Sequence, residues 1–401
     1  MSEPFLSGVR VLDLSRLLPG PYATTQLADM GADVVKVEEP TVGDPVRERR
    51  PRADDRSYTV LARNRNKESI AIDLKSEEGH EAFLNLAAEA DVVFESFRPG
   101  VVDRLGVGYE DVRAVNEEII YCSLTGYGQD GPCADRPGHD LNYVGISGLL
   151  GLTGDPDGPP AMPGYPVADF AGGLYAAMAI VAALAGRSFG RGGEYIDVSM
   201  TDVVASFSTA YADRYTGEGF VPRRGGTYLT GGHPAYQVFE TADGEYVTVA
   251  ALEEPFWNSF CDVIGEPELK DDYVGANETL PAERHQEVVE RFQARLRERT
   301  REEWMEEFVA NDVPAGPVND FEEVIDDPQL RTRGIFQELA LDDEQSMLQI
   351  GAPVQFGGDR LEEPEPVSRL GADTAALLHE IGYDEERIRE LAESGAVNLG
   401  E

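Results

Sequence analysis

Short apolar runs that favour β-strands alternate with helical patterns through the first two hundred residues. Several of these runs have no polar face, which is typical of parallel strands covered on both sides. They cover residues 9–15, 33–38, 69–74, 91–97, 118–125 and 194–200. Helix-like stretches lie between them at 21–32 and 76–90, the second opening on Ser76 as a cap. The alternation predicts an α/β fold with a mainly parallel sheet and helices on both faces.

The pattern changes after about residue 204. Residues 205–235 are rich in Gly, Pro and Arg and are expected to be a linker or loop. A smaller unit follows, with a hairpin signal at "ADGE" and amphipathic helices near 283–298 and 301–310. At 401 residues the chain is long enough for two domains.

The charge of the chain excludes several classes of partner. A net charge of −41 repels nucleic acid and anionic membranes, so neither is expected to bind. Of the 34 basic residues only four are lysine, namely Lys36, Lys67, Lys75 and Lys270. An acidic, lysine-poor composition resembles that of proteins from salt-accumulating halophiles, and we expect a halophilic archaeal source. Molar salt shortens the Debye length to about 3 Å and screens the self-repulsion of such a chain.

Cysteines and common motifs exclude several kinds of site. Three cysteines without CxxC spacing predict a reducing cytoplasm, no disulfide framework and no zinc site. No GxSxG, HExxH or P-loop motif is present, and "GYGQDG" at 126–131 is followed by Pro132 rather than by a helix. We therefore expect no metal and no redox cofactor. The longest apolar stretch, 174–186, is about 13 residues and is predicted to be a buried helix too short to span a bilayer.

One acidic residue stands in apolar surroundings. Asp169 lies in "PGYPVADFAGGLYAA", between an apolar run and two glycines that open another apolar run. A helix N-cap is the simplest explanation for such an aspartate.

Several motifs together resemble, in order and spacing, the family III CoA-transferases (CaiB/BaiF), which share a fold with the α-methylacyl-CoA racemases. They are "GVRVLDLSRLLPGPYATTQLADMGADVVKVE", "NKESIAIDLKSEEG", "ADVVFESFRPGVVDRLG", "GYGQDGP" and "PVADFAGGLYAAMAIVAAL". The resemblance implies a large Rossmann-like CoA-binding domain formed by 1–204 and 330–401. It also implies a small α+β domain at 236–329, a connecting segment at 205–235, and an interlocked homodimer.

In the transferases that this chain resembles, one aspartate carries the chemistry, and its position matches Asp169. The carboxylate attacks an acyl-CoA, and the reaction proceeds through an enzyme–CoA thioester that must be shielded from water. The glycines after Asp169 would allow close approach of the backbone, and amides at the helix start would stabilise oxyanions.

The resemblance also carries CoA contacts to individual positions. They are Leu17, Leu18, Ile72, Lys75, Ser96, Phe97, Arg98 and Arg104. Family members often have an arginine after the "VKVE" strand, where this chain has Glu39. Phosphate pairing is then expected from Arg47 or Arg98 instead. Glycines 225, 226, 231 and 232, with His233, match the glycine-rich loop that would form a lid over the substrate.

The racemase branch keeps an alternative open. A racemase needs a base on each face of the α-carbon. "GHDLNY" resembles the racemase histidine motif and would place His139 opposite Asp169, with Glu253 or Glu254 in the supporting position. Transfer is favoured, because the first and last quoted motifs look more transferase-like. The expected substrates are a short acyl-CoA such as succinyl-CoA and a small carboxylic or dicarboxylic acid such as mesaconate, citramalate or malate.

Overall fold

A computed structural model describes residues 4–53, 56–275, 278–341, 345–357 and 364–400. By contacts between Cα atoms the chain divides into two compact units. The first contains Met1–Ser147, Tyr165–Phe207 and Gln329–Glu401, and the second contains Gly148–Gly164 and Ser208–Pro328. The sequence-based boundaries differ from this division in assigning residues 148–164 to the large domain.

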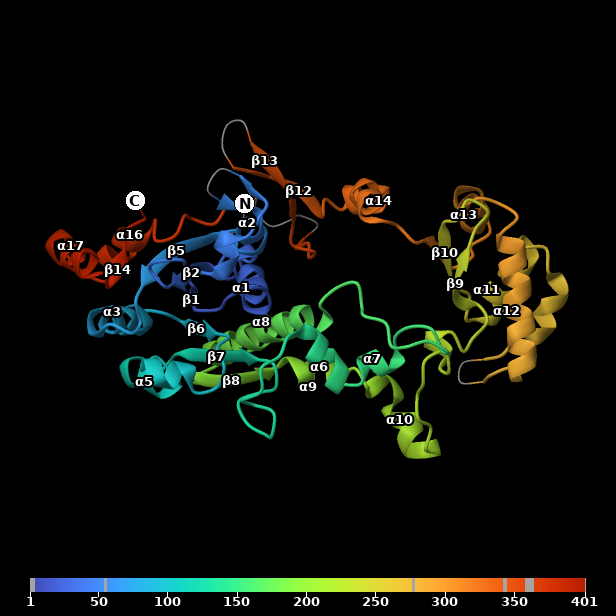
Figure 1. The fold of residues 1–401 in the computed structure, drawn as a ribbon, viewed down its shortest axis with the longest axis horizontal. Helices are drawn as coiled ribbons and strands as arrows, with labels where there is room; N and C mark the ends of the chain where they lie inside the picture. Colours follow the sequence, from blue (N-terminus) through green and yellow to red (C-terminus); the bar gives the residue numbers. More distant parts are fainter. Residues whose placement is uncertain (1–3, 54–55, 276–277, 342–344, 358–363, 401) are drawn as a thin grey trace. The chain divides into compact units, whose positions relative to one another are not determined.

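A seven-stranded sheet forms the centre of the first unit (Figure 1). Its order is β14-β5-β2-β1-β6-β7-β8, and all neighbours are parallel except β14, which pairs antiparallel with β5. The strands are β1 (Arg10–Asp13), β2 (Asp33–Glu38), β5 (Lys67–Ile72), β6 (Val92–Glu95), β7 (Ile120–Thr125), β8 (Glu194–Ser199) and β14 (Val397–Asn398). The predicted α/β class and parallel-dominated sheet are confirmed.

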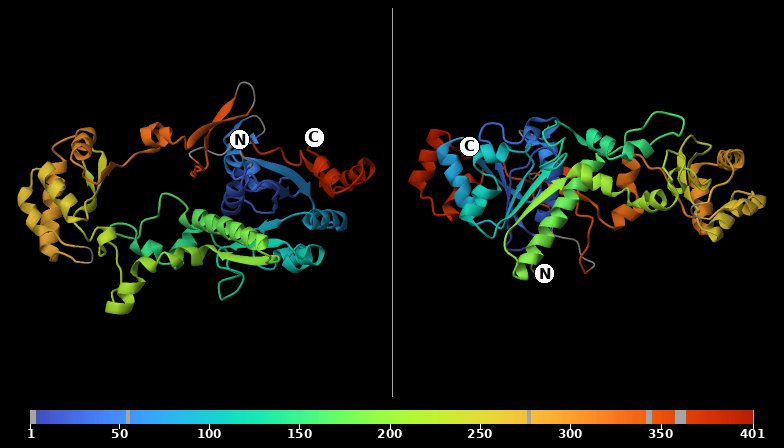
Figure 2. Two further views of the ribbon diagram at one scale, coloured as in Figure 1. Left: turned by 180° about the vertical axis from the view of Figure 1, so that it is seen from behind. Right: turned by 90° about the horizontal axis from the view of Figure 1, so that it is seen from below.

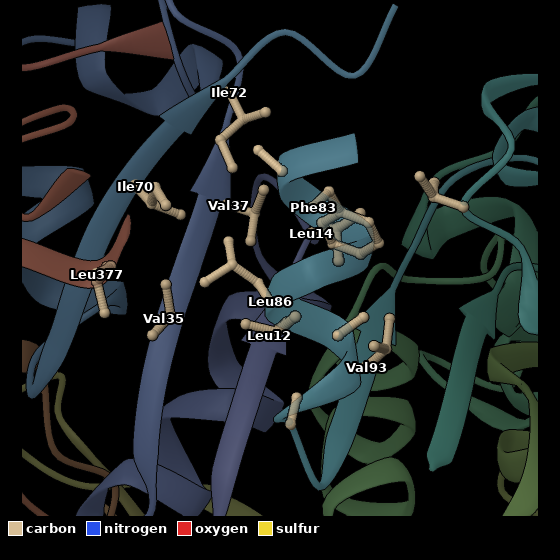
Figure 3. Close-up of a cluster of buried hydrophobic side chains, with 14 of the residues drawn as sticks. Leu12, Leu14, Val35, Val37, Ile70, Ile72, Phe83, Leu86, Val93 and Leu377 are labelled. Carbon is tan, nitrogen blue, oxygen red and sulfur yellow. The ribbon is translucent and has the colours of Figure 1, made fainter. Parts of the chain in front are cut away.

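One face of this sheet is covered by helices from both ends of the chain (Figures 1 and 2). Phe83 and Leu86 belong to one cluster of buried side chains with Leu12, Leu14 and Val35 on the sheet side, and Figure 3 shows Phe83 beside Leu14. The covering helices are α3 (Glu77–Ala88), α4 (Val101–Leu105), α5 (Tyr109–Val115), α16 (Thr374–Glu380) and α17 (Glu385–Ser394). Ser76 accepts the N–H of Gly79, which confirms the predicted cap of α3.

The other face carries α1 (Pro19–Asp29) and α8 (Val167–Ser188), which pack on each other. Helix α8 has 22 residues and by length and composition alone could cross a membrane, so the expectation of a 13-residue segment too short to span was wrong. Here α8 also contacts β7, β8 and α9 (Met200–Ser206). These contacts make it part of the layer that covers the sheet.

The second unit has its own core around a three-stranded antiparallel sheet of β9 (Tyr236–Glu240), β10 (Tyr246–Ala250) and β11 (Ala315–Pro317). Trp257, Phe260, Phe292 and Phe308 are buried in this core. Its helices are α7 (Leu149–Leu152), α10 (Thr209–Glu218), α11 (Glu254–Val263), α12 (Ala282–Leu296), α13 (Arg301–Ala310) and α14 (Phe321–Asp326). The segment 205–235, expected to be a linker or loop, therefore contains α10.

Shorter elements complete the first unit. Two antiparallel pairs, β3 (Arg52–Ala53) with β4 (Arg56–Ser57) and β12 (Phe336–Ala340) with β13 (Ser346–Ile350), share a small apolar cluster. The remaining helices are α2 (Tyr58–Arg63), α6 (Asp140–Ile146), α15 (Pro328–Thr332) and the 3-10 turn η1 (Pro45–Glu48).

Candidate active site

A cavity of about 670 Å³ opens where the loops after β1, β6 and β7 leave the sheet. The carboxyl ends of parallel strands are the usual place for a ligand in an open α/β sheet. All lining residues belong to the first unit. Those predicted from the sequence are Leu17, Leu18, Ser96, Phe97, Arg98, His139 and Asp169. Residues far apart in sequence thus meet in one cavity.

Asp169 lies in the first turn of α8, but it does not cap the helix. The Asp140 carboxylate, at the start of α6, accepts the backbone N–H groups of Ala168 at 2.6 Å and of Asp169 at 3.2 Å. The cap is therefore supplied from a different helix, which leaves the Asp169 side chain free to face the cavity. The first amides of α8 were expected to stabilise oxyanions. That expectation was wrong for the amides of Ala168 and Asp169, because both already donate to the Asp140 carboxylate.

The surroundings of Asp169 disfavour its charged form. Burial and then the neighbouring charge of Asp140 raise the pKa of Asp169 to about 7, against an opposing effect of Arg63. Near neutral pH part of the population is ionised. That ionised carboxylate is poorly hydrated, which favours reaction with an electrophile over interaction with water.

The two glycines after Asp169 serve helix packing. A Cβ on Gly173 would lie 2.7 Å from the backbone oxygen of Pro19 in α1, and one on Gly172 would lie 2.5 Å from Cγ of Met200 in α9. Their absent side chains let α8 approach both helices closely. Helix packing therefore accounts for both glycines, and the expected approach of the backbone to the substrate stays a prediction.

His139 precedes α6 and is exposed at the same cavity as Asp169. Its backbone N–H donates to Oδ1 of Asn142 at 3.0 Å, which fixes the start of α6. Beside it, Tyr143 packs edge-on against Tyr127, with ring centroids 5.1 Å apart. Gly126 and Gly138 leave room for this ring, because a Cβ on Gly126 would lie 2.3 Å from it. Tyr143 and Asp140 were not predicted as site residues, although both belong to the quoted "GHDLNY".

Five arginines line the cavity of this otherwise acidic chain: Arg16, Arg49, Arg63, Arg98 and Arg136. The guanidinium of Arg16 lies over the ring of Phe97, 4.8 Å from its centroid. Arg47, expected as a possible phosphate partner, is instead buried and donates to Glu38 at 2.8 and 2.6 Å and to the backbone oxygen of Ser368. That expectation was wrong for Arg47, because its guanidinium is already paired with the Glu38 carboxylate.

Glu39, the departure from the family pattern, has a local structural effect. Its carboxylate accepts backbone N–H groups of Thr41 and Gly43, both at 3.1 Å, and of Val42. The side chain thus holds the turn that follows β2.

Three predicted CoA contacts lie outside the cavity lining. Ile72 is 1% exposed in the core and its strand pairs with Val397, while Lys75 and Arg104 are exposed on the surface. The burial of Ile72 removes its side chain from any surface ligand in this structure. The assignment of Lys75 and Arg104 to CoA stays a prediction.

The remaining predicted residues lie in the second unit. Glu253 precedes α11 and is exposed, as is Glu254. Gly225 and Gly231 have positive φ angles of 64° and 94°, a conformation that favours glycine. Gly226 and Gly232 do not have a positive φ. His233 is buried, accepts the N–H of Ala235 at 3.2 Å and packs edge-on against Trp257. Their parts in catalysis stay predictions.

Among the described residues no group of three or more His, Cys, Asp or Glu side chains could hold a metal ion.

A profile of CoA-transferase family III matches residues 6–374. The chain belongs to CoA-transferase family III. Human succinyl-CoA:glutarate CoA-transferase is 35% identical, covering 99% of this chain and 90% of that protein. Succinyl-CoA:mesaconate CoA-transferase of Haloarcula marismortui is 34% identical, covering 94% and 97%. Human alpha-methylacyl-CoA racemase is 32% identical, covering 96% of each.

The fold agrees with that family. A crystal structure of a CAIB/BAIF family protein from Brucella suis matches with a TM-score of 0.82 and 32% identity, covering 95% of this chain and all of the other. Membership in CoA-transferase family III identifies the protein as an enzyme whose substrates include CoA thioesters.

Proposed function

We propose that this family III enzyme transfers CoA from succinyl-CoA or another short acyl-CoA to a small carboxylic or dicarboxylic acid, with Asp169 as nucleophile. The observation that carries the proposal is a single poorly hydrated carboxylate, Asp169, in a cavity lined by five arginines. Cationic walls attract the phosphates of CoA and the carboxylate of an acid substrate.

The chemistry consists of two half-reactions. The Asp169 carboxylate attacks the thioester carbonyl and expels CoA thiolate, which gives an aspartyl–acyl anhydride. The thiolate then attacks the aspartyl carbonyl, releasing the donor acid and leaving an aspartyl–CoA thioester. The acceptor carboxylate attacks the aspartyl carbonyl of this thioester and expels CoA thiolate, which gives an aspartyl–acceptor anhydride. The thiolate finally attacks the acceptor carbonyl of this anhydride, which gives the new acyl-CoA and releases the Asp169 carboxylate.

The choice of substrates rests on the relatives. Succinyl-CoA is the donor in the names of both the glutarate and the mesaconate transferases. We propose glutarate, mesaconate, citramalate and malate as the acids to test first.

Racemisation remains a second candidate, because His139 and Asp169 line the same cavity and a racemase is among the relatives. In that reaction one residue would remove the α-proton and the other would return it to the opposite face.

One experiment separates the candidates. The protein is incubated with succinyl-CoA and each acid, and separately with an α-methyl-branched acyl-CoA in deuterated water, and both reactions are followed by mass spectrometry. Transfer predicts a hydroxylamine-sensitive CoA adduct that is absent in Asp169→Ala and present in the exposed control Asp135→Asn. Deuterium at the α-carbon without an adduct or new acyl-CoA would refute the transferase.

We also propose an interlocked homodimer in a reducing cytoplasm. Support for a partner surface comes from exposed apolar side chains on α8, where Leu174, Tyr175 and Met178 are 46%, 41% and 59% exposed. A second copy is the simplest cover for such a face. Three free cysteines suit a reducing compartment. Light scattering at low protein concentration compares the mass of the wild type with that of Met178→Asp. Equal masses of the two proteins would count against this face.

A further inference from the structure

The first wall of the cavity is the loop that follows β1, residues 15–19, here called the Leu17 loop. Four of its residues, Arg16, Leu17, Leu18 and Pro19, line the cavity. Leu17 has φ of 72°, a left-handed conformation that a side chain with a Cβ disfavours. An unfavourable conformation of this kind persists only where the surroundings hold it.

Both peptide groups of Leu17 are held by side chains from outside the loop. Its N–H donates to the Asp44 carboxylate, at 3.3 Å to Oδ1 and 3.1 Å to Oδ2. Its carbonyl oxygen accepts from Nη1 of Arg63 at 3.0 Å. The Asp44 carboxylate also caps η1 by accepting the N–H of Val46 at 3.1 Å. One carboxylate therefore joins the Leu17 loop to the turn after β2.

Asp44 is itself held by a buried lysine. Nζ of Lys36, on β2, lies 3.3 Å from Oδ2 of Asp44, and both side chains have 0% exposure. The same ammonium donates to the backbone oxygen of Ser15 at 2.9 Å. Lys36 thus binds both the start of the Leu17 loop and the carboxylate that holds its centre.

A second buried pair supports the base of the loop. The Asp13 carboxylate accepts the N–H of Ser15 at 2.9 Å, and Nζ of Lys67 lies 3.0 Å from it. Burial works to raise the pKa of Asp13, but the charges of Lys67 and Lys36 outweigh it and lower the pKa to about 2. Two buried ion pairs, Lys36–Asp44 and Lys67–Asp13, therefore lie beneath the loop.

The use of lysine at these two places is informative. The chain has only four lysines among 34 basic residues, and two of them, Lys36 and Lys67, are in this cluster. The single nitrogen of Lys67 lies 3.0, 2.7 and 3.0 Å from side-chain oxygens of Asp13, Thr24 and Asn64. A compact ammonium with three donors can make such contacts from one point.

We propose that Asp44, held by Lys36, is a positioning residue that locks Leu17 in its left-handed conformation and so sets the affinity of the cavity for acyl-CoA. Neither Asp44 nor Lys36 lines the cavity, so their effect reaches the ligand through the Leu17 loop. The inference rests on the proposed function in taking acyl-CoA as the ligand. If fewer molecules hold the Leu17 loop in its binding-competent conformation, the apparent affinity falls in proportion to that population. Turnover at saturating substrate is then unchanged.

The main test removes both charges together, as Lys36→Met/Asp44→Ala, so that no buried charge is left unpaired. Calorimetry measures the Kd for free coenzyme A, and transfer assays give KM for succinyl-CoA and kcat. Both Kd and KM are expected to rise roughly tenfold, because a left-handed leucine is disfavoured by about that factor. The change in kcat is expected to stay below about twofold. Arg65→Met/Asp29→Ala is the matched control, because it removes both partners of a buried ion pair that does not line the cavity.

A double-mutant cycle with Leu17→Gly isolates the backbone effect. Glycine adopts positive φ freely, so in the Leu17→Gly background the same two substitutions are expected to raise Kd by less than about threefold. Asp44→Asn, which keeps the volume and one acceptor oxygen, serves if the double variant does not fold, and we expect it to raise Kd by about threefold.

The outcomes distinguish the two proposals. An equal rise in Kd with leucine or glycine at position 17, or a rise no larger than in Arg65→Met/Asp29→Ala, would refute the positioning function of Asp44. Wild-type protein that does not bind coenzyme A would instead refute the proposed function of the cavity.

Discussion

Replacing Asp169 with asparagine is expected to stabilise the protein at neutral and alkaline pH while it removes the nucleophile. The pKa of Asp169 is raised from an ordinary 3.8 to about 7. Because the folded-state pKa is the higher one, protonated Asp169 favours folding. This stabilisation is complete below about pH 4 and is lost as the pH rises to about 7.

The size of the effect follows from the shift. A difference of about three pKa units corresponds to about 4 kcal/mol, since one unit is about 1.4 kcal/mol. Asp169 faces an open cavity, so water screens part of this energy, and about 2–4 kcal/mol is a reasonable range. At pH 8 this should raise the melting temperature of Asp169→Asn above that of the wild type by roughly 2–5 °C, given the length of the chain.

The assay is thermal unfolding of the wild type, Asp169→Asn and the control Asp135→Asn, measured from pH 4 to 8.5 at fixed salt. Asp135 is an exposed aspartate of the same unit, so its substitution should leave the profile unchanged. The advantage of Asp169→Asn should be near zero at pH 4 and largest at pH 8. Equal melting temperatures of wild type and Asp169→Asn at pH 8 would show that Asp169 is not destabilised by burial, and the reasoning would fail.

Three further predictions concern charge and packing. Asp140→Asn should shift the acidic limb of the pH profile of adduct formation to lower pH, because the charge of Asp140 raises the pKa of Asp169; an unmoved limb would contradict this. Gly173→Ala should lower the unfolding free energy by about 1–3 kcal/mol, since its Cβ would meet the Pro19 backbone, whereas Gly217→Ala, with open space around it, should not. The melting temperature should rise between low and molar KCl, because salt screens a net charge of −41, and a flat salt dependence would rule this out.

Much of the candidate site follows from local sequence. The loops after β1 and β6 contain the predicted Leu17, Leu18, Ser96 and Phe97, and all four line the cavity with Asp169. The strands were predictable because buried parallel strands are continuous apolar runs. The sequence did not reveal that Ile72 points into the core, because an apolar residue near a strand end can face either side.

The sequence by itself determined the α/β class and singled out Asp169, because strand and helix periods and a short motif are local properties. Only the tertiary structure decided which charges have partners. Asp140 caps α8 from 28 residues earlier in the chain, and Arg47 is paired with Glu38. Lys36 joins Asp44 to the Leu17 loop. The physical reason is that burial and charge pairing depend on chain segments that meet only when the sheet forms, and no local pattern encodes those meetings.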